Sequence, residues 1–144
     1  MSTKKLSLTQ HQKHVGFKKA FDTYTYYLSI KNFIGAYVVA FSFLEDRISV
    51  AYVLLKDIQK EDRPKPNKFE NLNNKLSFLL KHKQLTSPDF AAFKKIADDR
   101  NEKLHEAMWN LDTFTEEACI SLINLARKAD KLAKKIKTIA PTNV

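Results

Sequence analysis

A short stretch near residue 100 combines three side chains whose chemistry suits a phosphodiester. Arg100, Asn101 and His105 lie within six residues of one another in a segment expected to be helical. A histidine can move protons near neutral pH, because its unperturbed pKa is about 6.5. An arginine holds phosphate oxygens through its fork of N–H donors. These residue types indicate metal-independent chemistry on RNA.

The spacing of these residues limits what one helix can do with them. Asn101 and His105 are four positions apart and therefore share a helix face. Arg100 and His105 are five apart, or about 140° around the axis, so one helix does not easily aim both at one phosphate. Two copies of the chain packed about a two-fold axis would place both of their motifs at the shared interface. A break near Asp99 is the alternative, because Asp99 to Glu102 fits a capping box.

The elements that position the motif are expected to be helices. The chain of 144 residues contains only two glycines and four prolines, too few turn residues for an all-β fold. We predict a single all-α domain, an up-down bundle of four or five helices. The expected helices cover 11–30, 32–60, 69–83, a segment from 87 through the motif, and 113–137. Residues 1–10 are expected to be a flexible N-terminus, 61–68 an internal linker and 138–144 a loose C-terminus.

Apolar residues recur at three- and four-residue steps in the second and fifth of these helices. The stripe on the second helix is wide, which is typical of a central helix covered on several sides. The expected buried residues of the second helix are Ile34, Tyr37, Val38, Phe41, Leu44, Ile48, Ala51, Tyr52 and Leu55. Those of the fifth helix are Ala118, Ile120, Leu122, Ile123, Leu125, Ala126 and Leu132.

Two helix starts carry capping signals. Ser87 is expected to be an N-cap, with Pro88 at the first helical position. Thr113 to Glu116 fits a capping box that opens the last helix.

Charge and cysteine content restrict the partners and the compartment. The net charge of +9 favours a polyanion, whether nucleic acid, anionic lipid or an acidic protein, although scattered lysines are also an ordinary solubilising surface. Cys119 is the only cysteine, so it is expected to be a buried thiol in a reducing compartment. No Cys/His spacing suits zinc, and neither a metal nor another cofactor is expected. The absence of a signal-like start and of a long apolar span predicts a cytoplasmic protein without membrane contact.

The motif and its surroundings resemble the HEPN (higher eukaryotes and prokaryotes nucleotide-binding) superfamily. Its signature is an arginine, a following polar residue and a histidine four to six residues after the arginine, which Arg100, Asn101 and His105 match. The layout is also similar: a long apolar second helix, a linker, the motif on a late helix and a long closing helix. Some members of the toxin branch have a tyrosine two residues after the histidine, where this chain has Ala107. The resemblance is therefore to the wider superfamily.

The resemblance implies a homodimeric, metal-independent endoribonuclease from a toxin–antitoxin, phage-defence or RNA-processing system. His105 would activate the ribose 2′-hydroxyl or protonate the leaving oxygen. Arg100 would stabilise charge on the scissile phosphate, and Asn101 would orient His105 or the substrate. Products would carry a 2′,3′-cyclic phosphate, single-stranded or loop RNA would be the substrate, and an antitoxin or other regulatory protein is a possible partner.

Several further residues have both a functional and a structural interpretation. Glu45 could orient Arg100 as a charged pair, as the resemblance suggests, or belong to a solvated strip. Trp109 could stack on a base, or pack in the core or a dimer interface. The lysine-rich segment 127–137 could follow an RNA backbone or be plain solvated surface. His105 itself could be an ordinary surface histidine.

Two main hypotheses of function follow from these observations. The first is the ribonuclease, and the alternative is a non-catalytic helical module that binds RNA or a protein partner through a basic surface. A third and weaker option is an amphipathic scaffold at an anionic membrane, but no segment combines a strong moment with a basic face.

Overall fold

The computed structural model describes residues 10–59, 71–106, 109–110 and 113–139, and these form an all-α bundle, as predicted. The predicted linker at 61–68 lies outside the described residues. No strand occurs in the described part of the chain. The five helices are α1 (Gln10–Ser29), α2 (Phe33–Gln59), α3 (Leu72–Lys81), α4 (Ser87–Glu106) and α5 (Glu116–Ile139).

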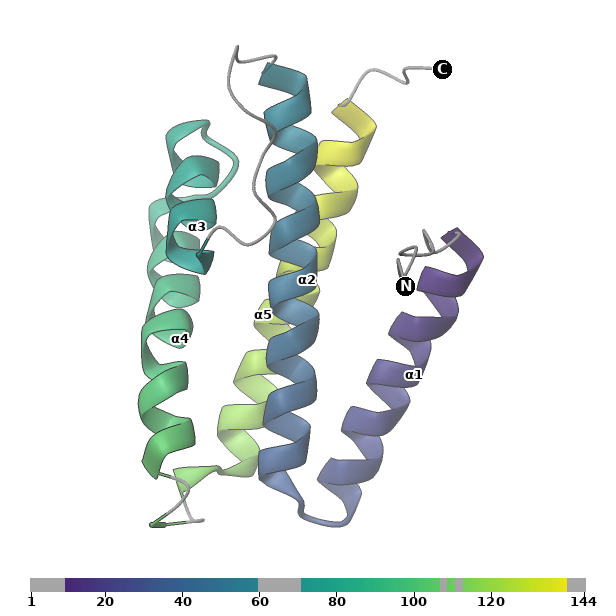
Figure 1. Ribbon diagram of the computed structural model, residues 1–144, viewed down its shortest axis with the longest axis vertical. Coiled ribbons are helices and arrows are strands. Elements are labelled where there is room, and N and C mark those ends of the chain that lie inside the picture. Colours follow the sequence, from purple (N-terminus) through teal and green to yellow (C-terminus); the bar gives the residue numbers. More distant parts are fainter. Residues whose placement is uncertain (1–9, 60–70, 107–108, 111–112, 140–144) are drawn as a thin grey trace, which may run out of the picture.

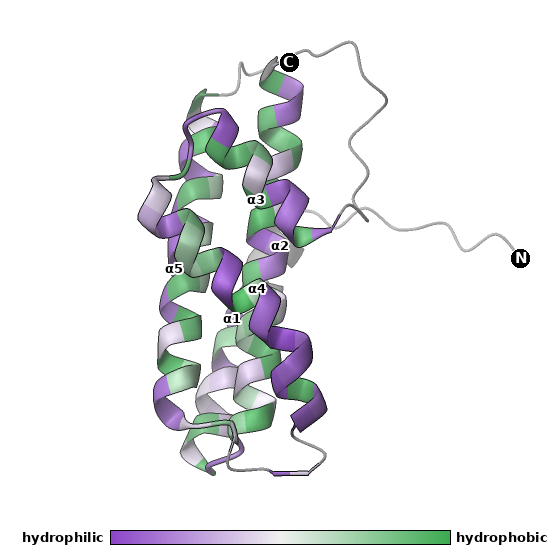
Figure 2. Ribbon diagram, turned by 90° about the vertical axis from the view of Figure 1, so that its left-hand side faces the viewer, coloured by the Kyte–Doolittle hydropathy of each residue, from purple (hydrophilic) through white to green (hydrophobic). Residues whose placement is uncertain are grey.

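The two longest helices, α2 and α5, form the centre of the bundle. They pack side by side along most of their length, with α3 and α4 on one flank and α1 on the other (Figure 1). The buried residues of the bundle are almost all hydrophobic. The last two turns of α4, in contrast, are mostly hydrophilic (Figure 2). The motif helix therefore lies at the edge of a core that α2 and α5 build.

The buried side chains confirm most of the expected core, although Ile34, Ala118 and Leu125 are half-buried and two further residues are exposed. Val38 and Ile120 are 44% and 42% exposed, although the apolar pattern predicted both as buried. Each lies at the margin of its stripe, and burial there depends on whether a neighbouring helix covers the margin. The pattern defines the centre of a helix face more sharply than its edges.

The helix starts differ from the predicted caps by one or two residues. The Oγ1 atom of Thr86 accepts a hydrogen bond from the Asp89 amide at 3.2 Å, so Thr86 caps α4, rather than Ser87. Thr115 Oγ1 accepts from the Ala118 amide at 3.2 Å, so α5 begins two residues later than the predicted capping box. Each helix start offers two nearby hydroxyl residues, Thr86 and Ser87 or Thr113 and Thr115, and only the folded backbone selects the one that caps.

None of the described helices combines the length and apolarity required to span a membrane.

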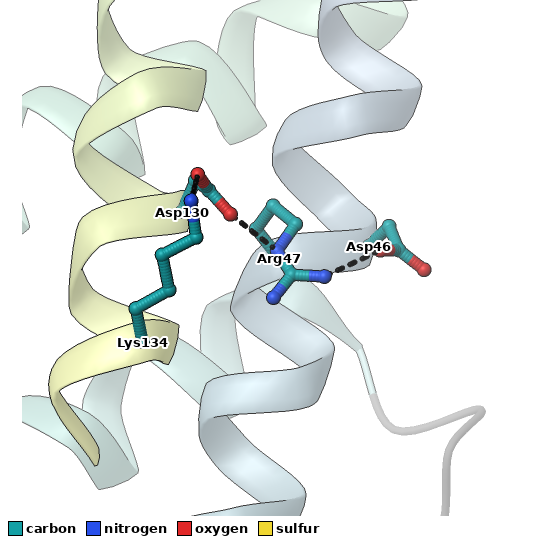
Figure 3. A network of polar contacts seen from close by, with 4 residues as sticks. All are labelled: Asp46, Arg47, Asp130 and Lys134. Carbon is teal, nitrogen blue, oxygen red and sulfur yellow. Dashed lines mark hydrogen bonds and ion pairs between the residues drawn. The ribbon is translucent and has the colours of Figure 1, made fainter. Parts of the chain in front are cut away.

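A buried arginine joins the two central helices. Arg47 of α2 lies 3.1 Å from Asp130 of α5, measured from Nε to Oδ1, and 3.5 Å from Asp46, while Lys134 lies 2.9 Å from the other oxygen of Asp130 (Figure 3). Only 11% of the Arg47 side chain is exposed. A guanidinium at this depth must be paired, because an unpaired buried charge is strongly destabilising. The network therefore fixes α2 against α5.

Candidate active site

The motif lies on one continuous helix. Helix α4 runs from Ser87 to Glu106 without interruption, so the possible break at Asp99 does not occur. A helical phase of about 140° therefore separates Arg100 from His105, together with about 7.5 Å along the axis. The fold does not bring these two side chains onto one face of α4.

Arg100 turns toward α2, where it makes two contacts. Its Nη1 atom lies 3.6 Å from Oε1 of Glu45, and its guanidinium carbon lies 4.4 Å from the centre of the Phe41 ring. The ring and the carboxylate are one helical turn apart on α2, so the planar guanidinium contacts both. The charged-pair interpretation of Glu45 thus matches the geometry.

The Arg100 contacts leave the guanidinium partly open to solvent. The side chains of Arg100 and Glu45 are each 40% exposed. An ion pair at this exposure is weak, since water screens it and both side chains lose rotamer freedom. An anion approaching from solvent can therefore reach Arg100 without dismantling the core.

Lys103 repeats this arrangement one turn further along α4. Its Nζ atom lies 5.7 Å from the centre of the Tyr37 ring. Two cations of α4, Arg100 and Lys103, thus face two aromatic rings of α2, Phe41 and Tyr37. Sequence reasoning placed these rings in the core and missed the pairing. The signal in the sequence was a similar spacing on the two helices. Arg100 and Lys103 are three residues apart on α4, and Tyr37 and Phe41 are four residues apart on α2.

The Tyr37 ring is almost fully buried under this contact. It is 1% exposed, and its centre lies 5.0 Å from that of Phe114 in an edge-to-face arrangement. Burial raises the pKa of the Tyr37 hydroxyl, Asp99 raises it further, and Arg100 acts in the opposite direction. The phenol therefore stays protonated at neutral pH, and the local charge that a ligand meets comes from Glu45, Asp99, Arg100 and Lys103.

Asn101 and His105 take no part in these contacts. Both residues are exposed, and within the described part of the chain no hydrogen bond joins their side chains. His105 occupies the last turn of α4. The imidazole is thus free to meet a ligand or a second protein chain.

Trp109 follows the end of α4 and is 82% exposed, with its amide bonded to the Glu106 carbonyl at 2.8 Å. Packing in the core of this chain, one of the two structural interpretations, is therefore wrong. Base stacking and packing against a second chain are the interpretations that its exposure allows.

The lone thiol takes no part in the motif. Cys119 is fully buried and donates a hydrogen bond to the Phe33 carbonyl at 3.3 Å. Burial raises its pKa to about 11, so it is a neutral thiol rather than a nucleophile at physiological pH. No group of three or more potential metal ligands from His, Cys, Asp and Glu gathers anywhere in the described ranges.

A shallow depression lies at another place, where the helix starts of α2 and α5 meet. It contains none of the motif residues. Its lining residues are Lys31, Asn32, Phe33, Ile34, Phe114, Thr115, Glu116 and Glu117.

Compared with protein-family models, curated proteins and solved structures, the chain matches none of them.

Proposed function

We propose that this protein is a metal-independent endoribonuclease of the HEPN type that acts as a homodimer on single-stranded or loop RNA. In this reaction the ribose 2′-hydroxyl attacks the adjacent phosphorus and the bond to the 5′-oxygen breaks. The products are a 2′,3′-cyclic phosphate and a 5′-hydroxyl. His105 accepts the proton of the 2′-hydroxyl or gives one to the leaving oxygen, and Asn101 orients the imidazole or the substrate.

The observation that carries the proposal is the setting of Arg100. Its guanidinium stacks on Phe41 and lies beside Glu45, yet 40% of the side chain remains exposed. These contacts hold the guanidinium in a defined orientation, which lowers the entropy lost on binding a phosphate. Preorganised N–H donors stabilise the extra negative charge of the transition state more than the ground state.

The helical phase of the motif supports the proposed dimer. Arg100 contacts α2 whereas the exposed His105 occupies another side of α4, so one chain does not present both to one phosphate. Two copies of α4 across a two-fold axis would combine Arg100 of one copy with His105 of the other. The exposed Trp109 is available to stack an unpaired base, which favours unstacked RNA over a duplex.

The alternative is a non-catalytic module that binds RNA or a protein partner. One observation favours it: Arg100 has partners within its own chain, so its contacts also make sense as a way to hold α4 against α2. The first proposal also includes a regulatory partner, such as an antitoxin, and a role in toxin–antitoxin, phage-defence or RNA-processing systems.

The test is an RNA cleavage assay in EDTA with purified protein and its His105→Ala variant. We expect RNA to be cleaved to products with a 2′,3′-cyclic phosphate, DNA of the same sequence to stay intact, and His105→Ala to lose at least about 100-fold in rate. The Lys95→Gln variant, altered at an exposed position on the same helix, should keep the wild-type rate. Intact RNA with folded, dimeric protein would favour the binding module.

A further inference from the structure

The outer face of the second half of α5 carries a dense group of cations, here called the α5 ridge. Six of the eleven residues from 127 to 137 are lysine or arginine, and one, Asp130, is acidic. This short segment thus holds a net charge of +5, more than half of the +9 of the whole chain. All six cations are exposed: Arg127, Lys128, Lys131, Lys134, Lys135 and Lys137.

Contacts within the protein neutralise little of this charge. Asp130 lies 2.9 Å from Lys134, but its other oxygen already pairs with the buried Arg47. Lys128 lies 3.3 Å from Asp89 of α4. Lys131, Lys135 and Lys137 form no ion pair with any residue in the described segments, so most of the ridge charge faces solvent.

The helix dipole does not explain the ridge. Cations at the carbonyl end of a helix are favourable, but the effect is confined to about the last turn. Of the ridge residues only Lys137 lies in the last turn of α5, which ends at Ile139. Arg127 and Lys128 lie about three turns earlier, close to the middle of the helix.

The arrangement of the ridge suits a linear polyanion. Arg127, Lys131 and Lys135 follow one another at four-residue steps, or about 6 Å along the helix axis. Repeated cations along a line match the regularly spaced phosphates of a nucleic-acid strand, with each contact releasing condensed counterions. The Arg127 guanidinium lies 5.5 Å from the centre of the Phe21 ring, which anchors that end of the ridge beside α1.

A membrane surface fits the ridge less well. Helices that lie on membranes bury large apolar side chains next to their basic face. The exposed large apolar residues of α5 are Ile120 and Ile139, and both lie outside the ridge. The ridge therefore offers charge without an apolar face to insert.

From this placement we infer that the α5 ridge is a docking track for the sugar–phosphate backbone of a nucleic-acid strand, separate from the Arg100–His105 motif on α4. The inference rests on the proposed function only in taking that strand to be RNA. Binding through the track is independent of base sequence and weakens steeply with salt. It would hold a strand on the protein while the motif acts elsewhere along it.

The experiment measures binding to a fluorescent 2′-O-methyl RNA, which lacks the nucleophile, over about 50 to 200 mM salt. The test variant is Lys131→Gln with Lys135→Gln, and the matched control is Lys81→Gln with Lys95→Gln, which removes equal charge from exposed positions on α3 and α4. In the ridge variant we expect roughly tenfold weaker binding and a salt slope reduced by about 1.4, while the control stays near wild type.

Unchanged binding in the ridge variant, or an equal loss in both variants, would overturn the inference. Binding of wild-type protein to phosphatidylserine vesicles, lost in the ridge variant and without any affinity for RNA, would overturn it in favour of a membrane. The outcome is separable from the proposed function. Cleavage of RNA without an effect of the ridge removes only the track, and ridge-dependent binding without cleavage removes only the ribonuclease.

Discussion

Two arginines join α2 to its neighbours, and they differ in how they are held. Arg47 has an 11% exposed side chain and lies 3.1 Å from Asp130 of α5, with Asp46 as a second carboxylate partner. Arg100 is 40% exposed and lies 3.6 Å from Glu45, with an aromatic ring as its other contact. Burial and short contacts commit the first guanidinium to the fold, whereas the second is oriented but still reachable. Similar residue pairs thus serve a structural role in one place and suit a ligand in the other.

The largest expected effect is on RNA cleavage by the Arg100→Ala variant. Removing a preorganised donor to a developing oxyanion costs about 100- to 1000-fold in rate. The free energy of unfolding should fall by only about 1 kcal/mol, because half-exposed ion pairs and cation–π contacts are each worth little. Cleavage kinetics and urea unfolding of the same preparation measure both quantities. A large loss of stability with unchanged cleavage would reverse the roles assigned to the two arginines.

The Arg47→Ala variant should lose about 2 to 3 kcal/mol in the free energy of unfolding. This is less than the full cost of breaking a buried pair, because Lys134 still neutralises Asp130 at 2.9 Å. Denaturant unfolding measures the loss, and the folded fraction should cleave RNA at the wild-type rate. A loss below about 1 kcal/mol would make Arg47 no more structural than an exposed arginine.

A smaller effect concerns the hydrogen bond that the Cys119 thiol of α5 donates to the Phe33 carbonyl at the start of α2. Burial raises the pKa of Cys119 to about 11 from 9.0, so the folded state holds the thiol proton more tightly than the unfolded state does. The stabilisation is complete below about pH 9 and is lost as the pH rises toward 11, by roughly 2 kcal/mol. Unfolding measured across this range should show a decline that is shallower in Cys119→Ala. If the free energy of unfolding fell equally with pH in the two proteins, the raised pKa of Cys119 would be contradicted.

The sequence predicted the helices well because each carries its own periodic signal. The observed α2, Phe33–Gln59, differs from the predicted 32–60 by one residue at each end. Local chemistry was less decisive at the caps, where Thr86 and Thr115 act in place of Ser87 and Thr113. The apparent capping box at Asp99 does not interrupt α4. A continuous helix keeps the contacts of α4 with α2 and α3, and these contacts stabilise it more than a cap at Asp99 would stabilise a broken helix.

The candidate site was predictable only where a residue type implied its partner. An arginine that packs against a neighbouring helix requires a carboxylate partner or an outlet to solvent, and the sequence indicated Glu45 as a candidate partner of Arg100. Contacts between helices, such as Lys103 over Tyr37, depend on the relative height of α4 and α2, which no local pattern encodes. The exposure of Trp109 was equally unpredictable, because burial of this side chain depends on whether another element packs over the end of α4.

The most direct test of the account mixes the inactive Arg100→Ala and His105→Ala variants under conditions that exchange subunits, and measures RNA cleavage in EDTA. If Arg100 of one chain acts with His105 of the other, the mixed dimer keeps one intact site. The mixture should then recover about a quarter of wild-type activity, because half of the dimers are mixed and each has one of two sites. No recovery beyond the separate variants, with subunit exchange confirmed, would contradict a site shared between two chains.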